Sequence, residues 1–122
     1  MQKKVFIVDD NKMNLVVVKD ALKDQFNATP IPSAEKMFMM MEKIVPDIIL
    51  LDILMPDMDG FEAAQILKNN EQFAKIPIIF LTSTIDSDTA ERAGKLGITD
   101  ILTKPFEKPL LIETINKYIS AG

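Results

Sequence analysis

Short runs of consecutive apolar residues alternate along the chain with longer segments in which apolar residues recur every three or four positions. The short runs predict strands at residues 4–8, 27–31, 47–51, 78–81 and 100–103. The longer segments predict helices at residues 12–25, 34–44 and 61–70, a fourth helix that Gly97 ends, and a fifth that Pro109 opens. Strands and helices that alternate in this way are typical of βαβ units around a parallel sheet.

Polar residues and glycine support three of these boundaries. Asn11 and Ser33 precede the first two helices, where a short polar side chain accepts a hydrogen bond from a free backbone N–H. In the turn before the third helix, Gly60 is expected to take a positive φ.

Two strands have patterns that predict their places in the sheet. Pro30 and Pro32 lie in and just after the 27–31 strand, and proline cannot donate to a neighbour on both sides, so this strand is expected at an edge. The apolar residues of the 47–51 strand are consecutive, which predicts a central strand covered on both faces.

Length and composition limit the classes of function. The chain has 122 residues, of which 48% are apolar, and we expect one domain, 1–122, with a single core. The net charge of -4 argues against a nucleic-acid surface, which needs clustered Lys and Arg. Cysteine is absent, and no apolar run approaches the ~20 residues that cross a bilayer, so we expect a cytoplasmic protein with no membrane contact. Histidine is also absent, which removes the usual general base and phosphohistidine carrier.

Polar residues gather where the predicted strands end. They are Asp9, Asp10, Asp52, Thr82 and Lys104. Crossovers between parallel strands are nearly always right-handed, so the carboxyl ends of the strands lie at the same edge of the sheet, where open α/β sheets bind ligands. Each residue alone is more typical of a helix cap, a turn or a solvated charge. Their joint position predicts one site.

The residue types at this edge predict phosphoryl chemistry. Asp9, Asp10 and Asp52 repel one another unless a cation lies among them, which favours a Mg²⁺ site. Mg²⁺ leaves room for a phosphoryl oxygen, and Thr82 and Lys104 supply a hydroxyl donor and a fixed cation for the others. Asp52 follows the most apolar strand and is the expected nucleophile, because a carboxylate can form an aspartyl phosphate.

Four motifs give the chain a family resemblance. They are Val8-Asp9-Asp10-Asn11, Leu51-Asp52-Ile53-Leu54-Met55-Pro56-Asp57-Met58-Asp59-Gly60, Leu81-Thr82-Ser83 and Thr103-Lys104-Pro105-Phe106. With them, nearly the whole chain resembles the receiver domains of two-component response regulators. The resemblance implies a flavodoxin-like fold, with a five-stranded parallel sheet in the order 2-1-3-4-5 and five flanking helices.

The resemblance also implies a role for each site residue. Asp52 accepts a phosphoryl group from a histidine kinase or a histidine phosphotransfer protein, and Thr82 and Lys104 contact the phosphate. The implied Mg²⁺ ligands are Asp9, Asp10, Asp52 and the backbone carbonyl of Leu54. The bond between Lys104 and Pro105 is implied to be cis. The domain would catalyse only its own phosphorylation and dephosphorylation, and the fourth helix, fifth strand and fifth helix would contact an unknown effector.

One position departs from the family pattern. Receiver domains commonly have an aromatic residue three positions before the lysine, and this chain has Ile101 there. A β-branched side chain has stiff χ1 preferences and sweeps a smaller volume than a ring. We therefore expect Thr82 and the loop that follows it to carry more of the signal.

Two helices contain apolar runs too long for one face. Leu15 to Val18 point around the whole first helix at about 100° per residue. We assign Val17 and Val18 to the core and expect Leu15 and Val16 to form an exposed patch where the phosphodonor docks. We interpret the run Met37-Phe38-Met39-Met40-Met41 as adaptable core packing with an outer methionine tolerated.

Three other functions stay open at this stage. A Mg²⁺-dependent phosphohydrolase would also use aspartates at strand ends, but it generally needs a second acid two residues after the nucleophile, where this chain has Leu54. A flavin or nucleotide module would need a Gly- or Ser/Thr-rich phosphate loop in place of Asp9 and Asp10. A receiver-like module that binds a partner without phosphorylation would not need the full acidic set.

Overall fold

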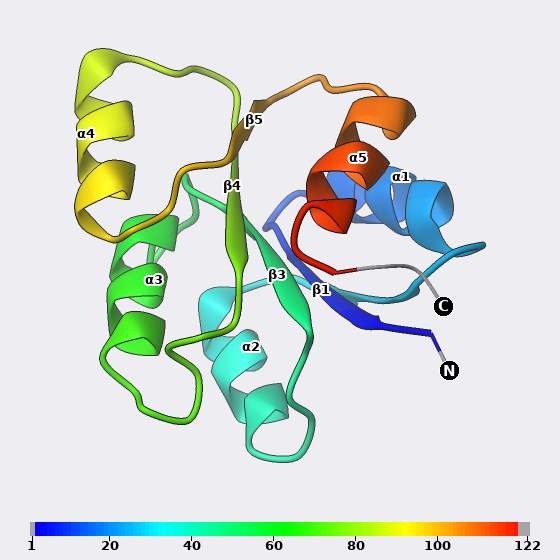
Figure 1. Cartoon of the computed structure of the whole chain (residues 1–122), viewed down its shortest axis with the longest axis horizontal. Helices are drawn as coiled ribbons and strands as arrows, with labels where there is room; N and C mark the ends of the chain where they lie inside the picture. The colour runs from blue at the N-terminus through cyan, green and yellow to red at the C-terminus, as the bar shows by residue number, and fades with distance from the viewer. Residues whose placement is uncertain (1, 120–122) are drawn as a thin grey trace.

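The computed structural model describes residues 2–119, in which strands and helices alternate from end to end (Figure 1). The elements are β1 (Lys4–Val8), α1 (Lys12–Leu22), β2 (Asn27–Ile31), α2 (Ala34–Met41), β3 (Ile48–Asp52), α3 (Gly60–Lys68), β4 (Ile78–Thr82), α4 (Ser87–Lys95), β5 (Ile101–Thr103) and α5 (Lys108–Asn116).

The strands form one parallel sheet in the order β2-β1-β3-β4-β5. The prediction of a flavodoxin-like fold with this strand order is confirmed. The chain adds β2 on one side of β1 and then adds β3, β4 and β5 on the other side. The carboxyl ends of β1 and β3 therefore lie side by side. In the register of this pair Val8 lies opposite Leu51, which places the next residues, Asp9 and Asp52, at the same level.

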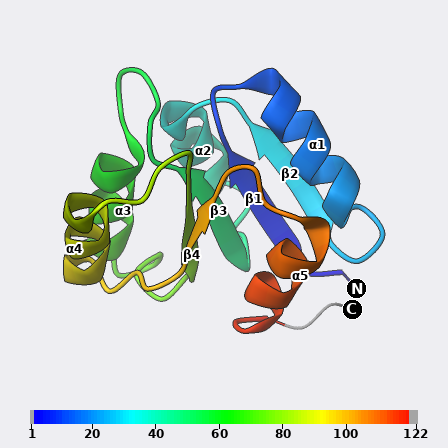
Figure 2. The same ribbon diagram turned by 90° about the horizontal axis from the view of Figure 1, so that it is seen from above.

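Helices cover both faces of the sheet. In Figures 1 and 2, α1 and α5 lie on one side of the strands, and α3 and α4 lie on the other. Successive residues of β1 divide between the two faces, because side chains alternate along a strand. Val5 and Ile7 pack with α1 and α5, whereas Phe6 and Val8 pack with α2 and α3. After the exposed Lys4, the strand is therefore apolar and buried from Val5 to Val8.

Four helices begin at a side-chain cap. The side chains of Asn11, Ser33, Asp59 and Asp86 each accept a hydrogen bond from a backbone N–H in the first turn of the helix that follows. At α3 the cap is reciprocal, because the Glu62 side chain also accepts from the backbone N–H of Asp59. The predicted caps at Asn11 and Ser33 are confirmed.

Several predicted boundaries are displaced by one to three residues. The first two helices end at Leu22 and Met41, before the predicted residues 25 and 44. The third strand extends to Asp52, because the backbone N–H of the next residue, Ile53, donates to the carbonyl of Leu81 in β4. Helix ends fray where no buried contact holds the last turn, and the apolar pattern alone does not reveal this.

The prediction of a positive φ at Gly60 is wrong. In this turn Asp57 takes the left-handed conformation, with a φ of 67°. Gly60 is the first residue of α3, and a Cβ at this position would lie 2.5 Å from the backbone oxygen of Asp52. The glycine is needed for the close approach of two backbone segments, not for an unusual φ.

The predicted faces of α1 are partly wrong. Leu15 is 7% exposed and belongs to the core, while Val17 is 59% exposed. On a helical wheel Leu15 lies about 60° from Val18 on the side of Leu22, whereas Val17 lies about 100° away on the other side. The buried face is centred between Leu15 and Val18, so Val17 lies outside it and faces solvent. Val16 is exposed, as predicted.

The methionine run of α2 behaves as predicted. Met37 and Met41 are buried, Phe38 and Met40 pack partly against the core, and Met39 is exposed.

The two edges of the sheet differ in length. At one edge β2 contains Pro30, as predicted, and at the other β5 has only three residues. Within residues 2–119, no helix combines the length and apolar character that crossing a membrane requires.

Candidate functional site

The predicted site residues meet at the carboxyl edge of the sheet. Asp9 and Asp10 follow β1, Asp52 and Thr82 are the last residues of β3 and β4, and Lys104 follows β5. Asp9, Asp52 and Thr82 are each 1–4% exposed, because these strands are covered by helices up to their ends. Asp10 alone of the three acids is exposed.

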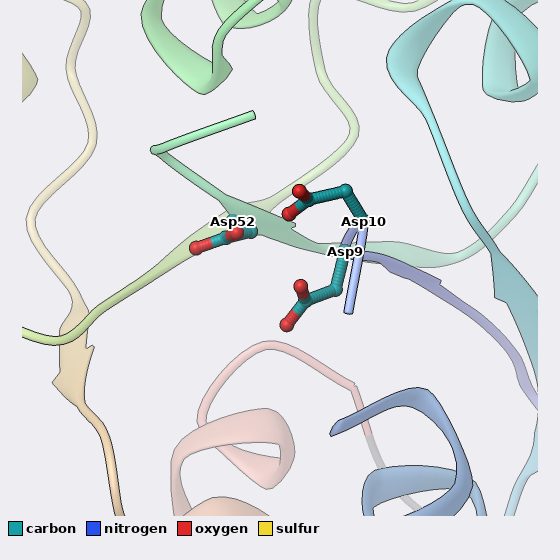
Figure 3. A group of neighbouring side chains, drawn as sticks. All are labelled: Asp9, Asp10 and Asp52. Carbon is teal, nitrogen blue, oxygen red and sulfur yellow. The ribbon is translucent and has the colours of Figure 1, made fainter. Parts of the chain in front are cut away.

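The three aspartates form a compact acidic cluster. One carboxylate oxygen from each lies within 4.8 Å of the others. Figure 3 shows the three side chains grouped over the adjacent ends of β1 and β3. Hard oxygen donors at this spacing fit the coordination preferences of Mg²⁺, and no softer ligand is interposed. The donor set therefore suits a divalent cation of this kind.

Lys104 bridges two of the acids. Its Nζ lies 2.9 Å from Oδ2 of Asp9 and 3.0 Å from Oδ1 of Asp52. The lysine approaches from β5, at the far edge of the sheet from β2, and the peptide bond that follows it to Pro105 is cis, as the family resemblance implies. A cation thus already lies between the carboxylates of β1 and β3.

Burial and charge oppose one another at Asp52. Desolvation on burial, aided by the Asp9 and Asp10 carboxylates, raises the pKa of Asp52, and the hydrogen bond and charge of Lys104 lower it. The raising effects are larger, and the resulting pKa of Asp52 is about 6. Burial also disfavours the charged form of Lys104, but hydrogen bonds to Asp9 and Asp52 outweigh it and raise the pKa of Lys104. The lysine is therefore a fixed cation at neutral pH.

Asp9 is held by more than Lys104. Its Oδ1 accepts a hydrogen bond from the backbone N–H of Asn11 at 2.9 Å, and its Oδ2 accepts from Nδ2 of Asn14 at 3.2 Å. The contact of Asn14 was not predicted from the sequence. The available signal was its position on the first turn of α1, four residues after Asp10 and facing back toward the strand end.

The Thr82 hydroxyl does not contact the acids in this structure. It donates to the carbonyl of Thr84 at 2.9 Å and accepts from the backbone N–H of Thr84 at 3.3 Å. Thr82 is therefore at the predicted edge, but its hydroxyl is bonded within its own loop. Leu54, whose carbonyl is the remaining predicted Mg²⁺ ligand, has an exposed side chain two residues after Asp52.

A hollow of about 350 Å³ adjoins the acids on the α1 side. Asp9, Asn14 and Lys104 form its polar part. The other lining residues are Val17, Val18, Leu81, Pro105 and Phe106. The hollow thus joins the acidic cluster to the exposed face of α1 and to the loop between β5 and α5.

Comparison with known proteins places the chain among signalling domains. The family model described as the response regulator receiver domain matches residues 5–116. The chain is 31% identical over 120 residues to the polar-differentiation response regulator DivK of Brucella ovis, and the match covers 98% of each protein.

Solved structures share the fold. The chemotaxis protein CheY4 of Vibrio cholerae superposes with a TM-score of 0.92 at 26% identity, covering 98% of this chain and 100% of that one. The receiver domain of a sensor histidine kinase from Pseudomonas aeruginosa has a TM-score of 0.87 at 26% identity, with 98% of both chains covered. In that structure a magnesium ion is coordinated in the active-site cleft.

Proposed function

Since the chain belongs to the response regulator receiver domain family, we propose that it accepts a phosphoryl group on Asp52 and switches a partner-binding surface in response. The donor is a phosphohistidine of a histidine kinase or a histidine phosphotransfer protein. We also propose that the protein acts in the cytoplasm and does not contact nucleic acid directly. The absence of nucleic-acid contact agrees with its net charge of -4.

One observation carries the proposal. Lys104 reaches from β5 to both Asp9 and Asp52, so that a cation and two acids from three strands share one small space. A lone acidic cluster is common on protein surfaces, but a partly buried lysine among the acids is an arrangement suited to a phosphoryl group.

The reaction proceeds by attack of Asp52 on phosphorus. One carboxylate oxygen of Asp52 forms the new O–P bond while the P–N bond of the phosphohistidine breaks, and the electron pair of that bond stays on the imidazole nitrogen. Lys104 exchanges its contact with Asp52 for a phosphoryl oxygen. The ammonium then balances the charge that the transferred group brings.

Mg²⁺ is the proposed cofactor, with Asp9, Asp10, Asp52 and the Leu54 carbonyl as its ligands. The chemistry that the bound ion supplies is neutralisation of the acids and of the phosphoryl oxygens. Asp10 is exposed and Asp9 is buried, so the first gives access from solvent and the second gives a fixed ligand direction.

Thr82 is the proposed link to the signalling surface. Its hydroxyl leaves the Thr84 carbonyl and donates to a phosphoryl oxygen, which draws the loop before α4 toward the site. The surface made by α4, β5 and α5 then changes for an effector. Unchanged amide shifts from Ser83 to Ala90 after binding of a phosphoryl mimic would exclude this route.

The phosphodonor protein is proposed to dock on α1. Met13, Val16 and Val17 are 59–69% exposed, and Val17 also lines the hollow beside Asp9 and Lys104. Because this apolar surface runs directly into the acidic cluster, its occupant is a protein that brings a phosphohistidine to Asp52. The docking surface is thus Met13, Val16 and Val17, and buried Leu15 is not part of it.

Mass spectrometry after incubation with a small acyl phosphate and Mg²⁺ tests the chemistry. The unaltered chain is expected to gain one phosphoryl group, and Asp52→Asn to gain none. Asp20→Asn makes the same change at an exposed acid in an ion pair with Lys23 on α1 and is the control, expected to react normally. An adduct of equal yield on Asp52→Asn would refute the assignment of the acceptor.

A further inference from the structure

Asn14 has no part in the chemistry proposed above, yet its side chain bonds to a site carboxylate. Its Nδ2 lies 3.2 Å from Oδ2 of Asp9, which is 1% exposed. The Asn14 amide donates through its N–H side, and the Asp9 oxygen accepts. The same Asp9 oxygen accepts from Lys104 at 2.9 Å.

The first turn of α1 forms a frame around Asp9. The backbone N–H of Asn11 donates to Oδ1 of Asp9 at 2.9 Å. The side chain of Asn11, as the helix cap, accepts from the backbone N–H of Asn14 at 3.1 Å. The cap thus fixes the backbone of Asn14, whose side chain holds the second oxygen of Asp9. Two uncharged donors from one helical turn therefore hold both oxygens of the carboxylate.

Lys104 changes one of its partners during the proposed reaction, because its Nζ exchanges Asp52 for a phosphoryl oxygen. Asn14 donates to the same Asp9 oxygen as Lys104 and takes no part in that exchange. A buried carboxylate that loses its hydrogen-bond donors raises the free energy of the folded protein, and its side chain is then free to rotate. Retention of the Asn14 bond keeps the direction of the remaining lone pairs unchanged.

We propose that Asn14 is a positioning residue that keeps Asp9 oriented for a divalent cation, both before and after Lys104 exchanges Asp52 for a phosphoryl oxygen. This inference rests on the proposed function, because it gives Asn14 a part in the same Mg²⁺-dependent site. An amide suits this part because it bonds the carboxylate without adding a positive charge that repels the cation. Partners that orient metal ligands commonly change affinity by about 10- to 100-fold when they are removed.

Three variants of the full chain test the inference. Asn14→Leu removes the donor at similar size, Asn14→Gln keeps an amide, and Gln65→Leu makes the amide-to-leucine change on the exposed side of α3. The Mg²⁺ dissociation constant of each unphosphorylated protein is measured by NMR titration. Asn14→Leu is expected to weaken binding about tenfold. Asn14→Gln should recover part of this loss, and Gln65→Leu should match the unaltered chain.

A kinetic measurement separates positioning from a general loss of structure. With a small acyl phosphate as donor, Asn14→Leu should raise the Mg²⁺ concentration for half-maximal rate, while the rate at saturating Mg²⁺ changes less than twofold. A Mg²⁺ constant within twofold of the unaltered chain, or no recovery in Asn14→Gln, overturns the inference. Failure of the unaltered chain to bind Mg²⁺ at all would instead refute the proposed function, and this inference with it.

Discussion

Gly60 lies where the chain has no room for a side chain. A Cβ there would be 2.5 Å from the carbonyl oxygen of Asp52 and 2.8 Å from Cα of Ile53, both of them backbone atoms that cannot turn aside. Its backbone N–H also donates to the carbonyl of Ile53 at 2.8 Å. The glycine therefore lets α3 begin directly against the backbone that positions Asp52.

Gly60→Ala is expected to destabilise the fold by about 1–3 kcal/mol, the usual cost of forcing extra atoms into a packed region. Chemical denaturation measures this change. Gly94→Ala is the matched control, because a Cβ at this exposed position of α4 meets no atom within 4 Å. In a helix interior that replacement should stabilise by about 0.5–1 kcal/mol. Equal effects of the two changes would contradict the steric explanation.

Residue identities at the site were predictable, but side-chain directions were not. Strand ends are visible in the apolar pattern, so Asp9, Asp52 and Lys104 could be assigned to one edge from the sequence alone. The bond of Asn14 to Asp9 and the turn of the Thr82 hydroxyl toward Thr84 depend on rotamers. Rotamers follow from neighbours that are distant in sequence, which a local pattern does not contain.

At the scale of elements, α1 has a buried face and an exposed apolar face. Leu15, Val18 and Leu22 fill the core, while Val16 and Val17 face solvent beside the site. A run of four consecutive apolar residues does not show which face of the helix is buried. The orientation of α1 was therefore predicted incorrectly at Leu15 and Val17, because it is decided by packing against β1 and α5.

Val17→Asp is expected to slow phosphotransfer from a histidine phosphotransfer protein about tenfold or more, since it places a charge in the proposed apolar docking surface. Acceptance from a small acyl phosphate should stay unchanged. Leu15→Asp should instead unfold the protein, because it buries an unpaired carboxylate. The two readouts are transfer kinetics and circular dichroism. Normal transfer to Val17→Asp would remove α1 from the docking site.

A polar contact joins the start of β5 to the end of α5. Asp100 accepts from Nζ of Lys117 at 2.7 Å and from the hydroxyl of Tyr118. Burial acts to raise the pKa of Asp100, but these two donors outweigh it and hold the pKa of Asp100 below its ordinary value of 3.8. The contact therefore favours the ionised form in the folded protein.

The lowered pKa of Asp100 determines how the stability of the protein changes with pH. The contribution of Asp100 to the free energy of unfolding should be complete at a pH well above its pKa in the unfolded chain. This contribution should be lost as the pH falls through its pKa in the folded protein. Asp100→Asn should then be less stable than the unaltered chain at pH 7, and the difference should shrink below about pH 4. Thermal unfolding at a series of pH values measures it. A difference that is constant with pH would exclude the ionic contribution.

At the scale of the whole molecule, the three acids of the site destabilise the fold that brings them together. Asp9, Asp10 and Asp52 repel one another, and Lys104 neutralises only part of their charge. The molecule has this crowding because the carboxyl ends of β1 and β3 lie side by side. The alternating pattern of strands and helices was enough to predict that these strand ends share one edge of the sheet. Binding of a divalent cation should therefore stabilise the folded state as a whole.

Mg²⁺ at ten times its dissociation constant is expected to stabilise the protein by about 1.4 kcal/mol. Asp10→Asn should abolish most of this gain while leaving the metal-free protein at least as stable, because it removes a repulsive charge. Denaturation with and without Mg²⁺ at constant ionic strength measures both effects. Asp20→Asn is again the control and should retain the gain.

The two edge strands of the sheet are poorly suited to pair with a strand of a second molecule. The Ile31 carbonyl accepts from the backbone N–H of Asp9, so the next residue back, Pro30, points outward, where it offers no N–H. The opposite side ends in the three residues of β5. Strand addition, the first step of fibril growth, therefore has little to pair with at either margin. A chain that is 48% apolar can remain dispersed when crowded, provided that it stays folded.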